Sequence, residues 1–253
     1  MKCTEQPPKP VIVASLRDVH TTAAQKQILR GVTFDIPEGS ITLISGPNGS
    51  GKSTALRTLA GLSKPDSGHA YLFGDSVYDQ PPKKIQKTLR NRVGLGFQAP
   101  NLDGGMTVFD NLIGNAEAFN NLDIRRAGAF AVLLGLHDKM YQKTSQLSGG
   151  EMLRVSLGRL LIPGPELILL DEPTSMVDPS GKEAIYTHLR NIRDKEGTTV
   201  VMISHDEEAR EIADQEIVIV SGQVAATRSF KAPSLPGQNP DSLASANFQP
   251  ELN

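Results

Sequence analysis

Residues 46–54, GPNGSGKST, have the composition of a loop that binds phosphate. The segment fits the pattern G-x-x-x-x-G-K-S, and it lies between a short apolar run, 41–45, and a helical stretch from about Lys52 to Gly61. Glycines let backbone N–H groups converge on one anion, and the free N–H groups of the following helix add to them. We therefore expect phosphate to be bound by Gly46, Pro47, Asn48, Gly49, Ser50 and Gly51.

The three side chains that follow complete a site for a nucleoside triphosphate. Lys52 is placed to reach the β- and γ-phosphates, and the hydroxyl of Ser53 is expected to bind Mg²⁺. Thr54 can hydrogen-bond the α-phosphate. The pattern predicts a nucleoside triphosphate and Mg²⁺ as the bound species.

Two adjacent carboxylates follow a second apolar run. Residues 167–170, LILL, read as a strand buried on both faces, and Asp171 and Glu172 come directly after it. The first acid beyond such a strand lies at the carboxyl edge of a parallel sheet, where ligands bind. Asp171 is a natural partner of Mg²⁺ through water, and Glu172 can polarise an attacking water molecule.

The elements that must position these residues alternate between strand and helix. After an antiparallel pair, 11–19 with 28–36, we expect strands at 41–45, 67–74, 93–97, 167–170, 198–204 and 216–227, the last a hairpin around Gly222, and helices at 52–61, 182–195 and 206–213. Apolar residues recur at helical spacing from about 107 to 162. The sequence predicts an α/β protein: a P-loop NTPase (RecA-like) core with a mostly parallel sheet, an N-terminal antiparallel β subdomain and an inserted helical subdomain.

Composition narrows the classes of protein. The 253 residues carry 26 Lys and Arg against 28 Asp and Glu, so the net charge of −2 argues against nucleic-acid binding through overall basicity. No apolar run approaches the roughly 18 residues that cross a bilayer. The single cysteine, Cys3, agrees with a reducing compartment. We expect one nucleotide-binding domain at 11–228, with its helical subdomain at about 99–160, and flexible tails at 1–10 and 229–253.

A third motif lies between the phosphate loop and the two acids in the sequence. Residues 147–151, LSGGE, precede a helical stretch, so Ser148, Gly149 and Gly150 form a second helix start suited to an anion. In order and spacing, the three motifs resemble those of the ATP-binding subunits of ATP-binding-cassette (ABC) transporters. The resemblance covers about 11–227. It implies ATP hydrolysis coupled to movement of separate integral membrane permease subunits, at the inner face of the cell membrane.

The resemblance also implies a partner chain and further site residues. In this family the signature loop of one cassette caps the ATP held by the phosphate loop of a second cassette, identical or paralogous, in a head-to-tail dimer. Gln98 resembles the glutamine that contacts Mg²⁺ and senses the γ-phosphate, Asp178 lies in a segment similar to the dimer loop, and His205 resembles the switch histidine. The resemblance implies that Glu172, His205 and Lys52 carry out catalysis. It implies no nucleic-acid partner.

One position departs from the family pattern, and other members of the superfamily are alternatives. Ala23 stands where the family has an aromatic residue that stacks on adenine, which leaves His20 as a weaker platform. A soluble ATPase acting with an assembly scaffold, as in iron–sulfur cluster biogenesis, is the alternative; the sequence DEPT at 171–174 favours the transporter type. The long inserts of DNA-repair and translation ATPases are missing, and intact catalytic positions argue against a non-catalytic cassette.

Overall fold

The computed structural model describes residues 10–96, 102–118, 124–175, 177 and 179–230. Its strands form two sheets. The four-stranded sheet has the order β2-β1-β4-β5, and all its pairs are antiparallel. These strands are β1 (Ile12–Ala23), β2 (Lys26–Pro37), β4 (Ser67–Leu72) and β5 (Asp75–Ser76). The antiparallel pair predicted at the N-terminus is confirmed.

The six-stranded sheet has the order β10-β9-β3-β8-β7-β6 and is parallel except for the edge strand β10. It consists of β3 (Ile41–Ser45), β6 (Val93–Gly96), β7 (Leu167–Asp171), β8 (Thr199–Ile203), β9 (Gln215–Val220) and β10 (Gln223–Ser229). Strands β3, β7 and β8 are buried along their whole length, which explains their unbroken apolar runs. The mostly parallel sheet expected from the sequence is confirmed.

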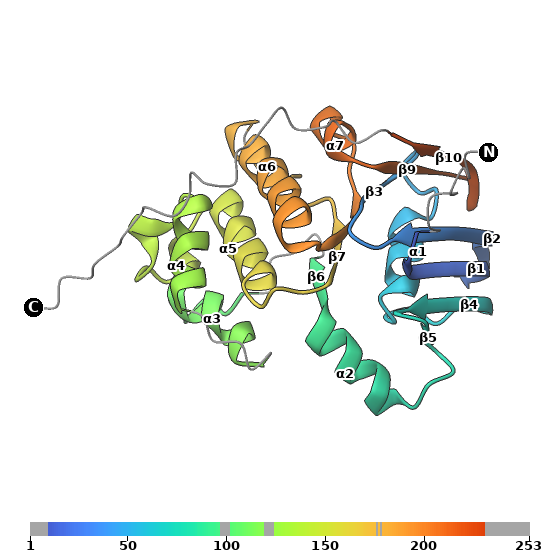
Figure 1. The fold of residues 1–253 in the computed structure, drawn as a ribbon, viewed down its shortest axis with the longest axis horizontal. Helices are drawn as coiled ribbons and strands as arrows, with labels where there is room; N and C mark the ends of the chain where they lie inside the picture. Colours follow the sequence, from blue (N-terminus) through green and yellow to red (C-terminus); the bar gives the residue numbers. More distant parts are fainter. Residues whose placement is uncertain (1–9, 97–101, 119–123, 176, 178, 231–253) are drawn as a thin grey trace, which may run out of the picture.

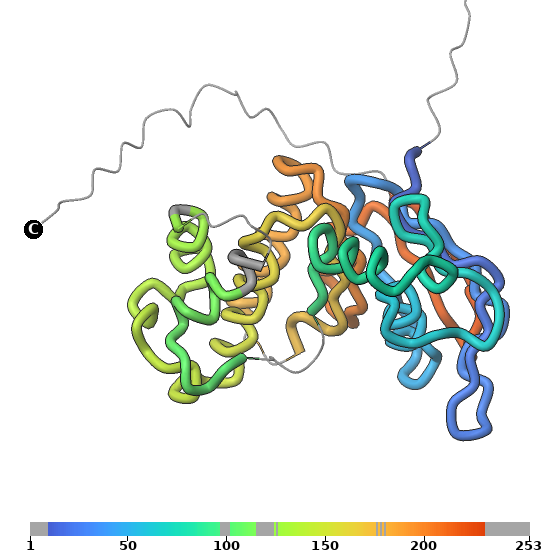
Figure 2. Tube along the Cα trace, turned by 90° about the horizontal axis from the view of Figure 1, so that it is seen from below, coloured from blue at the N-terminus to red at the C-terminus, as the bar shows by residue number. Residues whose placement is uncertain are grey.

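Helices cover both faces of this sheet (Figure 1). They are α1 (Lys52–Leu59), α2 (Pro82–Arg92), α3 (Val108–Ala118), α4 (Ile124–Leu133), α5 (Gly149–Leu161), α6 (Pro179–Glu196) and α7 (Glu207–Ile212), with short 3₁₀ turns η1 (His137–Lys139) and η2 (Thr144–Gln146). Helices α3, α4 and α5 lie together at one end, and β1 and β2 lie at the other (Figures 1 and 2). The helical character predicted for 107–162 is therefore confirmed. Among the described residues no helix combines the length and the apolar character needed to cross a bilayer.

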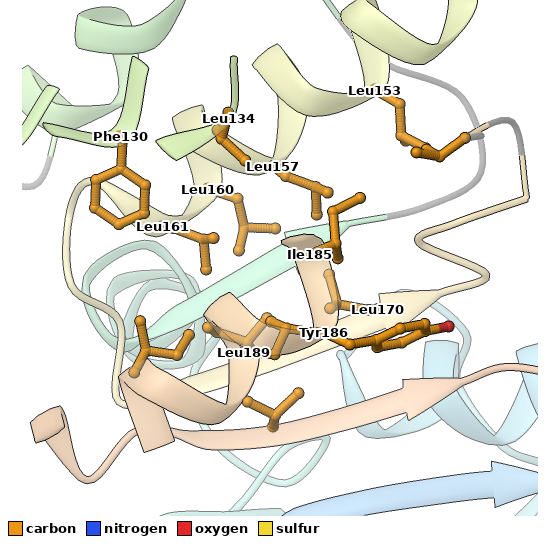
Figure 3. Packing of buried hydrophobic residues seen from close by; sticks show 14 of the residues in the cluster. Phe130, Leu134, Leu153, Leu157, Leu160, Leu161, Leu170, Ile185, Tyr186 and Leu189 are labelled. Atoms are coloured by element: carbon orange, nitrogen blue, oxygen red, sulfur yellow. The ribbon is translucent and has the colours of Figure 1, made fainter. Parts of the chain in front are cut away.

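The core has two parts, one on each face of the six-stranded sheet. Strand β7 shows the division, because Ile168 and Leu170 pack with α5 and α6, whereas Leu167 and Leu169 pack with α1 and the antiparallel sheet. Figure 3 shows the first part, where leucines of α5 face Ile185, Tyr186 and Leu189 of α6. This alternation follows from the two-residue period of a strand.

The structure differs from the sequence-based prediction in one helix and in the ends of two strands. Helix α2 was not predicted; its apolar side consists of Ile85 and Leu89 alone, both only partly buried, although Pro82 at its first turn is typical of a helix start. The strand expected to reach residue 74 ends at Leu72, because Phe73 and Gly74 turn the chain with positive φ. The C-terminal tail is expected from residue 229, but β10 includes Ser229, and Phe230 donates its N–H to Asp214 O at 2.7 Å.

Candidate nucleotide site

The loop between β3 and α1 is shaped by glycines. Gly46, Gly49 and Gly51 have φ values of 135°, 74° and 105°, in the region that disfavours other residues. A Cβ on Gly46 would lie 2.0 Å from Ile219 O, and one on Gly51 would lie 2.8 Å from Leu29 Cδ2. Glycine at position 46 is therefore required by the backbone of β9, and glycine at position 51 by its positive φ and by Ile28 O, which a Cβ would approach to 3.1 Å.

The loop fits a polyanion. Gly51 is the N-cap of α1 and offers no side-chain bond to the first turn, so the N–H groups that begin this helix keep their capacity to donate. The Oγ of Ser50 is buried and has no hydrogen-bond partner among the described residues. Buried polar groups are normally paired, so this hydroxyl is suited to a ligand oxygen. Asn48 is exposed at the turn, and Thr54 is half-buried in α1.

The Lys52 ammonium lies across this loop. It donates to Gly46 O at 2.8 Å and to Pro47 O at 3.0 Å. Burial lowers its pKa below the ordinary value, while the carboxylates of Glu172 and Asp171 act in the opposite direction. The cation is thus held at the mouth of the loop and close to the two acids at the end of β7.

Asp171 and Ser53 form the candidate Mg²⁺ site. Ser53 Oγ donates to Asp171 Oδ1 at 3.2 Å, which joins the start of α1 to the end of β7. Asp171 is 3% exposed, and burial raises its pKa. Among the described residues no group of three or more His, Cys, Asp or Glu side chains could hold a metal. Hydroxyl and carboxylate oxygens fit Mg²⁺, which takes few protein ligands and fills the others with phosphate and water.

Glu172 and His205 stand together at the ends of neighbouring strands. Glu172 has a φ of 52°, and its N–H donates to Ile203 O of β8 at 3.0 Å. The turn brings Glu172 Oε1 to 4.0 Å from His205 Nε2, with 30% and 51% of the two side chains exposed. Both groups are therefore accessible to a water molecule at the carboxyl edge of the sheet.

A partly buried polar cluster fixes the segment that contains His205. Asp206 accepts hydrogen bonds from Thr174 Oγ1 at 2.7 Å, Tyr186 OH at 2.8 Å and Lys182 Nζ at 2.7 Å. Burial would raise the pKa of Asp206, but these donors outweigh it and lower the pKa. Sequence reasoning missed this cluster, since its members are spread over three elements; the Asp directly after the histidine was the available signal.

The start of α5 has a complete capping box. Ser148 Oγ accepts from Glu151 N at 3.4 Å, and Ser148 N donates to Glu151 Oε2 at 2.8 Å. Lys139 forms an ion pair with Glu151. The bond from Lys139, followed by that from Ser148, lowers the pKa of Glu151 to about 2. Gly149 and Gly150 begin the helix beside this carboxylate, whose charge is balanced by Lys139.

Two predicted site residues, Gln98 and Asp178, lie outside the described residues. Ala23 is the last residue of β1, opposite Lys26. The ring of His20, the expected substitute for an aromatic platform, lies 3.1 Å from Asp18 Oδ1 and 3.4 Å from Gln27 Nε2.

A phosphate-binding loop after a central parallel strand, with acids at the end of β7, defines a P-loop nucleotide-binding protein of α/β fold. The family model described as ABC transporter matches residues 29–175. The chain belongs to the ABC transporter family.

Known relatives agree with this membership. The chain is 37% identical over 211 residues to the methionine import ATP-binding protein MetN 1 of Acinetobacter baylyi, covering 81% of this chain and 59% of that protein. It is 32% identical over 206 residues to the lipoprotein-releasing system ATP-binding protein LolD of Bacteroides thetaiotaomicron, covering 78% and 92%. The dimeric post-hydrolysis structure of the ATP-binding cassette MJ0796 with ADP and Pi is similar, with a TM-score of 0.79, 28% identity and coverage of 87% and 99%.

Proposed function

We propose that this chain is the ATP-hydrolysing subunit of an ABC transporter, and that it acts in a head-to-tail pair of cassettes. In each site the phosphate loop of one cassette faces Ser148, Gly149 and Gly150 of the other. The named relatives support the ATP-binding role, and the dimeric relative supports pairing.

The observation that carries the proposal is the position of two helix starts suited to anions. Helix α1 packs Leu56 and Leu59 on one face of the six-stranded sheet, whereas α5 packs Leu157 and Leu160 on the other. Figures 1 and 2 show the two helices apart, in different parts of the molecule. A single nucleotide at the phosphate loop therefore leaves the start of α5 for the nucleotide of a second cassette.

The chemistry follows from the side chains at the strand ends. Lys52 moves its donors from the loop carbonyls to the β- and γ-phosphates. Ser53, Asp171 and Gln98 would hold Mg²⁺, which would supply positive charge that offsets the charge of the phosphate oxygens. Glu172 orients the attacking water and accepts its proton, and His205 supports the γ-phosphate.

Closure of the pair places a polyanion in each of the two sites, shared between the two chains, and excludes water from it. The Ser148 segment and Asp178 of the opposite cassette complete the site. Hydrolysis and loss of phosphate remove the shared charge, so the interface opens again. The opening and closing of the interface between the two cassettes moves the membrane subunits.

We assign the membrane partner to the surface around α2. A groove of about 730 Å³ runs beside α2 and Leu95 of β6, the strand that leads to Gln98. Helix α2 contains no acid, and Lys83, Lys87 and Arg90 have no carboxylate partner among the described residues. This surface suits a cytoplasmic segment that carries acidic residues on a permease subunit at the inner face of the membrane.

Complementation tests the head-to-tail pairing. Lys52→Ala disables the phosphate loop, and Ser148→Arg blocks the start of α5, so each variant alone should lack ATPase activity. In a mixed pair one site keeps both intact halves, so mixing the two purified variants should restore part of the wild-type rate. If each chain completed its own site, the mixture would stay as inactive as either variant.

Co-purification tests the membrane partner. Exchange of Lys83, Lys87 and Arg90 for Glu should release the chain from its native membrane complex, whereas the ATPase rate of the purified chain should stay close to wild type. Retention of the membrane subunit by this variant would contradict the assignment of α2.

A further inference from the structure

Glu216 is a fully buried carboxylate that the proposed chemistry does not use. It is 0% exposed, and it lies on β9 directly behind the phosphate loop, where Gly46 approaches the backbone of Ile219. A buried charge is costly unless it is paired and hydrogen-bonded, so its partners identify what it holds together.

Three elements meet at this carboxylate. Ser45 Oγ, at the end of β3, donates to Oε1 at 2.8 Å, and Arg210 Nη2, on α7, donates to the same oxygen at 2.7 Å. Arg228 Nη1, on β10, donates to Oε2 at 3.0 Å. Burial would raise the pKa of Glu216, but the bonds from Arg210, Ser45 and Arg228 outweigh it and lower the pKa.

The elements joined at Oε1, β3 and α7, border the phosphate loop and the segment of His205. Ser45 immediately precedes Gly46, the first residue of the phosphate loop. Arg210 lies in α7, which begins two residues after His205. A cavity of about 380 Å³ lies between these parts and is lined by Gly46, Pro47, His205, Arg210, Glu216 and Arg228, among others. Beside this cavity, Glu216 Oε1 joins β3 to α7, because it accepts one hydrogen bond from Ser45 and one from Arg210.

We propose that Glu216 is a positioning residue that sets His205 relative to the phosphate loop, through Arg210 on one side and Ser45 on the other. Asp206 ties the same segment to Thr174 and the end of β7, so the His205 segment is held from two directions. The inference rests on the proposed function, because the role of His205 belongs to it.

The two arginines provide a matched comparison. Their side chains are 54% and 59% exposed, and each donates one hydrogen bond to Glu216. Arg210→Ala and Arg228→Ala each leave the carboxylate with one arginine and with Ser45, so their effects on melting temperature should be similar. Only Arg210 is attached to the helix that follows His205.

ATPase kinetics of the full chain test the proposal. Arg210→Ala should lower kcat about tenfold and change KM for ATP less than twofold, whereas Arg228→Ala should keep kcat within twofold of wild type. The double variant Ser45→Ala, Arg210→Ala should fall no further than the stronger single variant, because both changes break the same bridge. The ring resonances of His205 should shift with Arg210→Ala and stay in place with Arg228→Ala.

A purely structural role would give a different result. Equal losses of kcat in the two arginine variants, or unchanged His205 resonances with Arg210→Ala, would overturn the positioning role and leave the proposed function intact. Absence of ATPase activity in the wild-type chain would instead contradict the proposed function itself.

Discussion

Glu172 Oε1 lies 4.0 Å from His205 Nε2, although 32 positions of the sequence separate the two residues. The pair forms because β7 and β8 are adjacent parallel strands whose carboxyl ends lie side by side. The N–H of Glu172 bonds to Ile203 O, which fixes the turn that carries the acid toward the histidine. A half-buried carboxylate and an exposed imidazole are thereby placed where a water molecule can reach both.

Glu172→Gln should trap a closed pair of cassettes. The amide keeps the shape of the side chain and cannot accept a proton from water, so ATP stays intact between the chains. Light scattering coupled to gel filtration should show a dimer in MgATP, and the ATPase rate should fall at least roughly a hundredfold, the lower range for general base catalysis. Glu183→Gln, at an exposed position of α6, is the control. A Glu172→Gln variant that hydrolyses ATP at the wild-type rate would exclude Glu172 as the base.

Much of this arrangement could be predicted because local pattern and topology agree. The apolar run 167–170 predicts a strand buried on both faces, and parallel neighbours then bring its acids to the same edge as the phosphate loop. The phosphate-loop motif also predicts glycine at positions 46 and 51, where the structure shows a positive φ and a close approach of backbone atoms.

The side-chain hydrogen bonds and ion pairs between elements could not be predicted, because they depend on how segments far apart in the sequence are aligned in the fold. Glu216 reads as an ordinary first residue of a hairpin strand, and nothing in the sequence shows that Ser45 lies opposite it. The Lys139–Glu151 pair depends on how η1 packs against the start of α5. Helix α2 was missed because its apolar side consists of Ile85 and Leu89 alone, which are only partly buried against the core.

Asp171→Asn should separate the binding of ATP from that of Mg²⁺. An amide is a neutral and weaker ligand than a carboxylate, so the Mg²⁺ concentration that half-saturates ATPase activity should rise roughly tenfold, about 1.4 kcal/mol. ATP binding in the presence of a chelator should change little, because Lys52 and the loop N–H groups remain. Titration calorimetry with and without Mg²⁺ measures both. Equal weakening under the two conditions would show that Asp171 acts on the loop rather than on the metal.

Lys139→Met should weaken ATP-dependent pairing. The change leaves the Glu151 carboxylate without its cation beside Ser148, where the phosphate of the opposite cassette is proposed to bind. The loss should be a few-fold, in the range of about 0.2–1 kcal/mol for a partly exposed ion pair. The dimer dissociation constant, measured in the Glu172→Gln background with MgATP, is the readout. The double change Lys139→Met, Glu151→Gln should restore pairing, and failure to do so would mean that Lys139 acts by packing instead of charge.

His188 should make the protein less stable in mild acid. Its ring packs edge-on against Phe130, with 4.8 Å between the ring centroids. Burial lowers the pKa of His188 from 6.5 to about 4; nearby Glu196 opposes this effect and Arg126 adds to it. The free energy of unfolding that His188 contributes is complete above pH 6.5. It is lost as the pH falls toward 4, because the unfolded chain binds the proton more readily.

His188→Phe should remove this dependence while keeping a ring against Phe130. The shift corresponds to a loss of up to about 3 kcal/mol between pH 6.5 and pH 4 in the wild-type chain. Urea unfolding at a series of pH values measures it, and His137→Phe, at an exposed position, is the control. If the His188→Phe and wild-type curves stay parallel across this range, the buried histidine does not govern the acid response.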